Sequence, residues 1–131
     1  MKYLFLPLLL LSLLLAAVGC GESNGPVDTA ESFLQALNEN DLDTVKALGC
    51  SQRLDKYVEF VERNIRMKTG VEYDVDCSLE SEQGDHAVVR IQGVSTFHGL
   101  GENGEQSRDV DGRVDMVREE GRWKYCVGTG S

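Results

Sequence analysis

Hydrophobic and polar residues recur with two different periods along the chain, and the period changes at Gly70. Before that residue, apolar side chains return every three or four positions, which is the spacing of amphipathic helices. Pro26 suits the first turn of one such helix. Asn40 as N-cap and Gly49 as terminator bracket a second helix, and Ser51 and Gly70 bracket a third in the same way. The pattern therefore predicts three helices in the first half of the mature chain.

After Gly70 the period is two, which is typical of β-strands with one buried face. Four segments show the alternation: residues 71–80, 86–97, 110–116 and 123–127. Polar, glycine-containing segments at 81–85, 98–106 and 119–121 separate them and are predicted to be turns or loops. Helices followed by meandering strands indicate the α+β class, with about three N-terminal helices packed on one face of a curved four-stranded antiparallel sheet.

The chain begins with a different kind of segment. Residues 3–18 form an almost unbroken apolar run that follows a single positive charge at Lys2. The run is shorter than the roughly 20 residues that a spanning helix needs, so it predicts a secretory signal peptide at 1–19. It closes on Ala17-Val18-Gly19-Cys20, which resembles the lipobox of bacterial lipoproteins. The resemblance implies cleavage before Cys20, acylation of its thiol with palmitate-type chains, and a location on a membrane of the bacterial cell envelope, facing the periplasm or the exterior.

Composition argues against two classes of protein, nucleic-acid binders and disordered chains. The 131 residues carry a net charge of −9, which argues against a nucleic-acid partner, because binding to phosphates requires clustered Lys and Arg. A hydrophobic fraction of 41% is too high for a disordered chain. After the signal peptide and a short polar tether at 20–25, the length supports one domain, at 26–131.

Both ends of that domain resemble a known superfamily. The helix at 30–37 (AESFLQAL), the segment at 40–45 (NDLDTV) and the strand, turn and Trp-Lys strand at 117–125 (VREEGRWKY) resemble nuclear transport factor 2-like domains. Together with the lipobox they are similar to a group of short bacterial lipoproteins, most of them of unknown function. The resemblance implies a cone-shaped fold, whose interior is a binding pocket or an active site in members of the superfamily.

The chain contains four cysteines. If Cys20 is acylated, Cys50, Cys77 and Cys126 remain, which is enough for one disulfide and one thiol. The resemblance implies a bond between Cys50 and Cys126. Strand parity favours a bond between Cys50 and Cys77, because Cys126 is out of phase with the inward-facing Tyr125. We predict the Cys50–Cys126 bond that the resemblance implies, with Cys77 reduced and buried, and keep Cys50–Cys77 as the alternative. The spacing of the cysteines does not fit a zinc site, and we predict no metal site.

The two histidines are the other candidates for chemistry. His86 shares a strand face with Arg90, and Asp74 and Asp76 lie on the corresponding polar face of the neighbouring strand. A His–Asp pair can act in general acid–base catalysis, but this face points away from the helices, so we interpret the group as a solvated surface. His98 falls in a glycine-rich loop. Sequence motifs of serine hydrolases, zinc proteases and phosphate-binding loops are absent, and we predict no catalytic residue and no cofactor.

A run of carboxylates precedes the third strand. Asp109, Asp111 and Asp115, with Glu102 and Glu105 in the preceding loop, could hold calcium in principle. The run passes directly into a strand pattern, whereas a calcium loop needs a turn there. We therefore interpret these carboxylates as a charged outer face that keeps the sheet soluble.

Aromatic residues dominate the predicted interior. These residues are Phe33, Tyr57, Tyr73, Phe97, Trp123 and Tyr125. They either fill the core or line a pocket, and we favour the core because a chain of this size has few aromatic residues. The first functional hypothesis is a non-enzymatic module that binds an envelope protein or a small apolar ligand. The alternative is a small isomerase- or dehydratase-like enzyme with its active site inside the cone. An enzyme would need buried ionisable groups, and the predicted inward positions contain none.

Overall fold

The computed structural model describes residues 25–99 and 104–127. The predicted signal peptide, Cys20, the first residues of the tether and Glu102 lie outside the described residues. Three helices come first, followed by four strands, as the periodicity predicted; they are α1 (Pro26–Asn38), α2 (Leu42–Leu48), α3 (Leu54–Met67), β1 (Gly70–Gln83), β2 (His86–His98), β3 (Glu105–Glu119) and β4 (Arg122–Tyr125).

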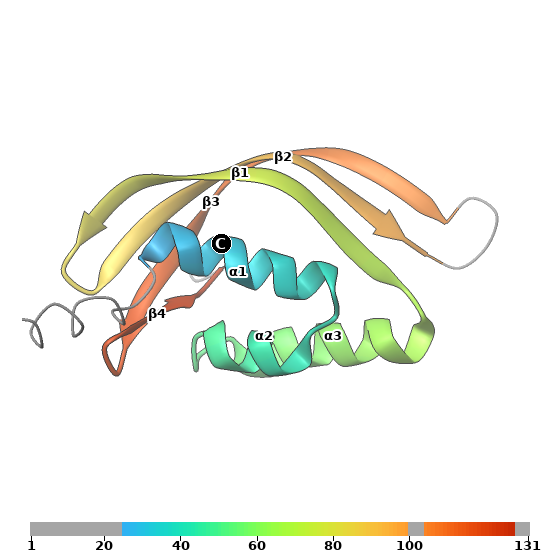
Figure 1. Ribbon diagram of the computed structural model, residues 1–131, viewed down its shortest axis with the longest axis horizontal. Helices are drawn as coiled ribbons and strands as arrows, with labels where there is room; N and C mark the ends of the chain where they lie inside the picture. The colour runs from blue at the N-terminus through green and yellow to red at the C-terminus, as the bar shows by residue number, and fades with distance from the viewer. Residues whose placement is uncertain (1–24, 100–103, 128–131) are drawn as a thin grey trace, which may run out of the picture.

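The strands form one antiparallel meander in the order β1-β2-β3-β4. The sheet arches over the helices, with α1 beneath its concave face and α2 and α3 on the far side of α1 (Figure 1). This is the predicted α+β architecture. In the described part of the chain no helix is long and apolar enough to cross a membrane.

The start of α2 differs from the prediction, whereas its end agrees with it. Asp41, not Asn40, caps the helix, because the Asp41 carboxylate accepts a 3.2 Å hydrogen bond from the Thr44 backbone N–H. Hydrogen bonds from the Thr44 hydroxyl and backbone lower the pKa of Asp41. Asn40 instead takes a positive φ of 51° in the turn between the first two helices. Gly49 ends α2 as expected.

Both predicted boundaries of α3 are wrong. The N-cap is Arg53, and Ser51 contributes its backbone N–H and its hydroxyl to the Glu119 carboxylate instead. At the other end Lys68 adopts the left-handed conformation, with φ of 55°, while Gly70 already begins β1. At the start of the helix the contact of Ser51 with the sheet replaces a cap, and at its end the Lys68 and Thr69 N–H groups donate to carbonyls of the last turn, at Ile65 and Asn64.

The hairpins are tighter than the sequence suggested. Residues 81–83, predicted as a turn, belong to β1, because Gln83 pairs with His86 and leaves only Gly84 and Asp85 in the turn. Gly84 has a φ of 58°, as such two-residue turns require. The next strand pair also extends further, to the pairing of His98 with Glu105. Long strands carry the sheet well beyond the helices.

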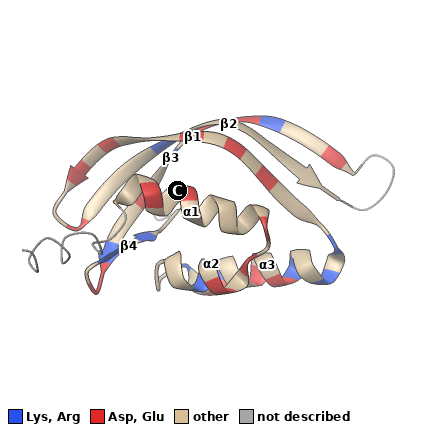
Figure 2. Ribbon diagram, viewed as in Figure 1, with Lys and Arg blue, Asp and Glu red and all other residues tan. Residues whose placement is uncertain are grey.

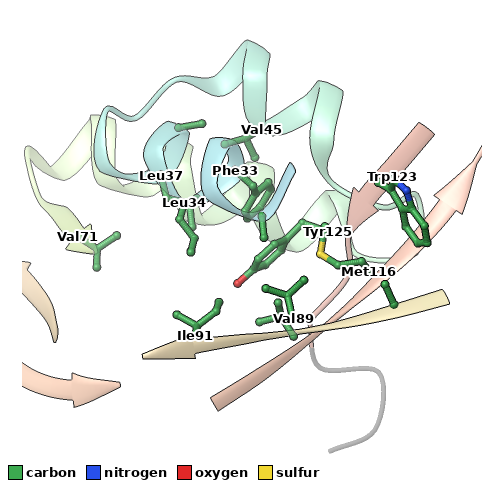
Figure 3. Close-up of a cluster of buried hydrophobic side chains, with 14 of the residues drawn as sticks. Phe33, Leu34, Leu37, Val45, Val71, Val89, Ile91, Met116, Trp123 and Tyr125 are labelled. Carbon is green, nitrogen blue, oxygen red and sulfur yellow. The ribbon is translucent and has the colours of Figure 1, made fainter. Parts of the chain in front are cut away.

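The hydrophobic core lies between α1 and the middle of the sheet (Figure 3). Phe33 of α1 stacks on Tyr125 of β4, with 4.1 Å between ring centroids, and Tyr57 of α3 contacts Phe33 edge-on at 4.9 Å. Val89 of β2 and Met116 of β3 point from the sheet toward this cluster and are fully buried. The aromatic contacts therefore join α1, α3 and β4.

One glycine permits a close approach of two strands. Gly93, in the middle of β2, has a φ of 154°, a conformation that side chains other than glycine rarely adopt. A Cβ there would lie 2.2 Å from the Asp74 carbonyl oxygen of β1. Glycine at this point in a strand marks a close approach of the neighbouring backbone.

The disulfide joins Cys50 to Cys126. It connects the segment after α2 to the end of β4, where the Cys50 N–H also donates a 2.9 Å hydrogen bond to the Tyr125 carbonyl. The parity argument for Cys77 was wrong because β4 ends at Tyr125, so Cys126 has already left the strand and its alternation. Cys77 is a free, half-buried thiol on β1.

Candidate functional site

A groove of about 630 Å³ separates α3 from the concave face of the sheet. This volume lies within the roughly 300–1,000 Å³ that is common for small-molecule sites. The residues around it come from α3 and from three strands; they are Phe60, Val71, Tyr73, Ser95, Phe97, Gln106, Ser107, Arg108 and Val110. Aromatic and aliphatic side chains thus share the groove with a few polar groups.

Strand register explains how these side chains meet. Tyr73 of β1 pairs with Ser95 of β2, and Ser95 pairs with Arg108 of β3, so the three form one row across the concave face. Neighbouring strands are about 4.8 Å apart, which places the first and last backbone positions of the row about 10 Å from each other. The small side chain of Ser95 leaves space between the two larger ones. This row forms the floor of the groove.

The edge of the sheet beside the groove is fixed by α1. The Asn38 side chain accepts a 2.6 Å hydrogen bond from the Tyr73 N–H and donates a 3.1 Å hydrogen bond to the Tyr73 carbonyl. Asn38 therefore takes the place of a neighbouring strand at this point of β1. The clamp holds the backbone that carries the Tyr73 ring.

A smaller cavity of about 290 Å³ lies next to the groove and shares Phe60 and Tyr73 with it. It reaches toward the core, where Phe33, Tyr57 and Tyr125 line it.

Five of the six aromatic residues singled out from the sequence thus border one of the two cavities, and Phe33 and Tyr125 also belong to the core. Trp123 lines neither of these cavities. It is only 6% exposed, and the Arg118 guanidinium lies 4.6 Å from the centre of its ring. Trp123 therefore belongs to the core, the interpretation favoured from the sequence, whereas Phe97, with 43% of its surface exposed, lies at the groove.

Two residues of the groove were missed. Phe60 of α3 was not singled out, yet it lines both cavities, whereas Ile65 of the same helix is 52% exposed. Arg108 was not singled out. Extending the alternation of Val110 and Val114 by one step toward the N-terminus would have placed Arg108 on the inner face.

The hydroxyl of Tyr73, in the groove, and the thiol of Cys77 on the same strand both have a raised pKa. Burial raises the pKa of Tyr73, an effect that the positive charge of Arg108 partly offsets. Burial also raises the pKa of the neighbouring inward-facing thiol, Cys77, to about 11. Both groups therefore stay protonated near pH 7.

The outer face of the sheet is acidic and ion-paired, as expected. Arg90 contacts Asp111 at 3.2 Å, and Arg113 contacts Glu80. Figure 2 shows acidic positions along β1 on this arch. In the described ranges, 25–99 and 104–127, no three His, Cys, Asp or Glu residues come together as a metal site would require.

The histidines do not form the predicted grouping. His86 lies at the β1–β2 hairpin opposite Gln83, whereas Asp74 and Asp76 pair with residues in the middle of β2, so the expected cluster does not exist. His98 lies 3.4 Å from the Glu72 carboxylate, and both are exposed at the far end of the sheet.

No protein-family profile and no curated protein matches this chain. Solved structures do match it. One is a Campylobacter jejuni protein described as an NTF2-like transpeptidase, with a TM-score of 0.51 and 18% identity over 80% of this chain and 100% of the other. The domain has the nuclear transport factor 2-like fold.

Two further structures show how widely this fold is used. An epoxide hydrolase-like protein of Mycobacterium tuberculosis matches with a TM-score of 0.51 and 15% identity over 80% of this chain and 79% of the other. The intermembrane space region of the chloroplast protein ARC6 matches with a TM-score of 0.55 and 14% identity, over 79% and 94%. Identities this low establish the nuclear transport factor 2-like fold alone, and the fold hosts more than one kind of function.

Proposed function

We propose that this protein is a lipoprotein of the bacterial cell envelope whose nuclear transport factor 2-like domain binds a small apolar ligand without catalysis. The groove between α3 and the sheet carries the proposal. Phe60, Tyr73 and Phe97 present aromatic surface around a volume of about 630 Å³. A concave site of this size, lined by apolar side chains and a few polar groups, is the usual form of a ligand site.

The chemistry of the lining supports binding rather than catalysis. Among the described residues around the groove, the groups that can ionise are Tyr73 and Arg108. Burial raises the pKa of Tyr73, away from neutrality. General acid–base catalysis works best with a group whose pKa lies near the working pH, and Tyr73 does not meet that condition.

The N-terminal sequence supports membrane attachment. The charge at Lys2, the apolar run and the Ala17-Val18-Gly19-Cys20 segment together have the form of a lipoprotein signal. Since α1 begins at Pro26, five residues, 21–25, lie between the lipidated cysteine and the first helix. A chain of that length spans at most about 20 Å, which would keep the start of the domain near the bilayer.

Lipidation is tested by expressing the full-length chain and a Cys20→Ser variant in a bacterium that is fed an alkyne-bearing fatty acid. We expect label in the wild type and none in the variant, since the thiol is the acceptor of the acyl chain. Equal labelling of the two proteins would refute the anchor.

Ligand binding is tested by photo-crosslinking in isolated membranes with a dodecanol that carries a diazirine. We expect labelled peptides from the groove, including the one that contains Phe97. Ser95→Phe should abolish this label, because the larger ring fills the floor of the groove. Val94→Phe is the matched control, since Val94 is the adjacent residue of β2 on the opposite, exposed face. Label lost in both variants, or found only outside the groove, would contradict the proposal.

A further inference from the structure

The groove contains one charged side chain among its described lining residues, and that residue is a cation in a protein of net charge −9. Arg108 occupies an inward-facing position of β3, at the end of the row that begins with Tyr73 and passes through Ser95. Its charge acts on the Tyr73 hydroxyl, whose pKa it lowers against the larger effect of burial. Arg108 is exposed to solvent and lines the groove on the same face of the sheet as Tyr73.

Arg108 also differs from the arginines on the outer face of the sheet. Arg90 and Arg113 each contact a carboxylate, Asp111 and Glu80 respectively. Within residues 25–99 and 104–127, Arg108 has no carboxylate within 4 Å. Among the described residues the guanidinium thus has no anionic partner, and its N–H donors can bind a carboxylate.

We propose, on the basis of the binding function proposed above, that the ligand is a single-chain amphiphile whose carboxylate binds Arg108 while its hydrocarbon chain lies along Phe60, Val71 and Phe97. A fatty acid anion has this form. The planar guanidinium fork matches the two oxygens of a carboxylate, and one cation balances one negative charge. A doubly charged phosphate would need further cations, and the described lining offers none.

Polar neighbours support this placement of the carboxylate. Gln106 lies two residues before Arg108 on the same face of β3 and lines the groove, and Ser95 lies beside Arg108 in the row. Their amide and hydroxyl groups can donate to a carboxylate oxygen that the guanidinium leaves free. The apolar part of the lining comes from Phe60 of α3, Val71 of β1 and, next to the polar residues, Phe97 and Val110. The groove thus offers a cation with polar neighbours and an apolar surface beside them, as an amphiphile requires.

The test compares two photo-crosslinking probes on the full-length protein in membranes: a diazirine-bearing dodecanoic acid and the corresponding dodecanol. Each probe is applied to the wild type, Arg108→Gln, Arg108→Lys and Arg113→Gln. Because both probes partition into the bilayer, the measured quantity is the groove labelling of each variant relative to wild type for the same probe. Arg113→Gln is the matched control, since it removes a cation from the opposite face of the same strand.

We expect Arg108→Gln to lower labelling by the acid about tenfold and to leave labelling by the alcohol unchanged, as the loss of one charge-assisted pair implies. Arg108→Lys should keep part of the acid labelling, and Arg113→Gln should behave as wild type. If both probes keep labelling Arg108→Gln, the groove binds apolar ligands but the anion assignment is wrong.

Other outcomes overturn the inference differently. If labelling by both probes falls in Arg108→Gln, the arginine shapes the groove instead of binding the head group. An equal loss in Arg113→Gln would show a general charge effect. If a dodecyl phosphate probe responds to Arg108→Gln as the acid does, the groove accepts anions in general and the choice of a carboxylate is wrong. Absence of groove labelling in the wild type would refute the proposed binding function itself.

Discussion

Replacing Cys50 and Cys126 together by alanine should lower the free energy of unfolding by about 4.5 kcal/mol. The disulfide closes a loop between residues that are 76 positions apart. In the loop-entropy relation, a closed loop of that size restricts the unfolded chain by this amount at 25 °C. The loss would be a large share of the roughly 5–15 kcal/mol that a domain possesses.

Urea denaturation of the mature protein measures this difference. Trp123 is the one tryptophan in the chain and is buried, so its fluorescence reports unfolding. Reduced wild type should match the double variant, because reduction opens the same loop without removing atoms. Cys77→Ala is the control and should keep most of the stability, since Cys77 is a half-buried free thiol. A loss below about 1 kcal/mol in the double variant would refute the entropic argument.

Three further predictions concern the sheet. Gly93→Ala should lower the free energy of unfolding, measured by urea denaturation, by about 3 kcal/mol, because a Cβ would lie 2.2 Å from the β1 backbone. Gly112→Ala is the control and should change it little, because a Cβ there meets nothing within 4 Å. Equal losses in the two variants would contradict the account of Gly93. Trp123→Ala should lower the free energy of unfolding by about 3–5 kcal/mol and His86→Ala by less than about 0.5 kcal/mol, because only the first substitution removes a buried ring. A Trp123→Ala variant as stable as the wild type would contradict this. Cys77, with its pKa raised to about 11, should react with iodoacetamide about 100-fold more slowly at pH 8 than a thiol of pKa 9, and its rate should rise up to pH 11; a plateau near pH 9 would refute the effect of burial.

The order of helices and strands could be predicted from the sequence because the information is local. Periods of three to four and of two residues are set by the geometry of each element, whatever packs against it. The inward faces of β2 and β3 followed for the same reason, and so did the exposed, ion-paired outer face. The resemblance to known lipoproteins, not the periodicity, supplied the Cys50–Cys126 pairing.

Contacts between distant segments decided the rest. Ser51 resembles a helix cap in sequence, yet it binds Glu119, which is 68 residues away. Cys126 has the wrong strand parity only if β4 continues past Tyr125, and β4 ends there. Both errors arose because a local pattern was extended to a position where a tertiary contact had already changed the backbone.

The groove itself belongs to the tertiary structure. Tyr57, Tyr73 and Trp123 have similar aromatic surfaces, and their sequence positions do not show which ring fills the core and which borders a cavity. That depends on how far α3 stands from the concave face of the sheet, and on the small side chain of Ser95 between two large ones. The absence of a carboxylate near Arg108, within the described parts of the chain, is likewise a property of the strand register, because register alone determines which side chains become neighbours across a sheet.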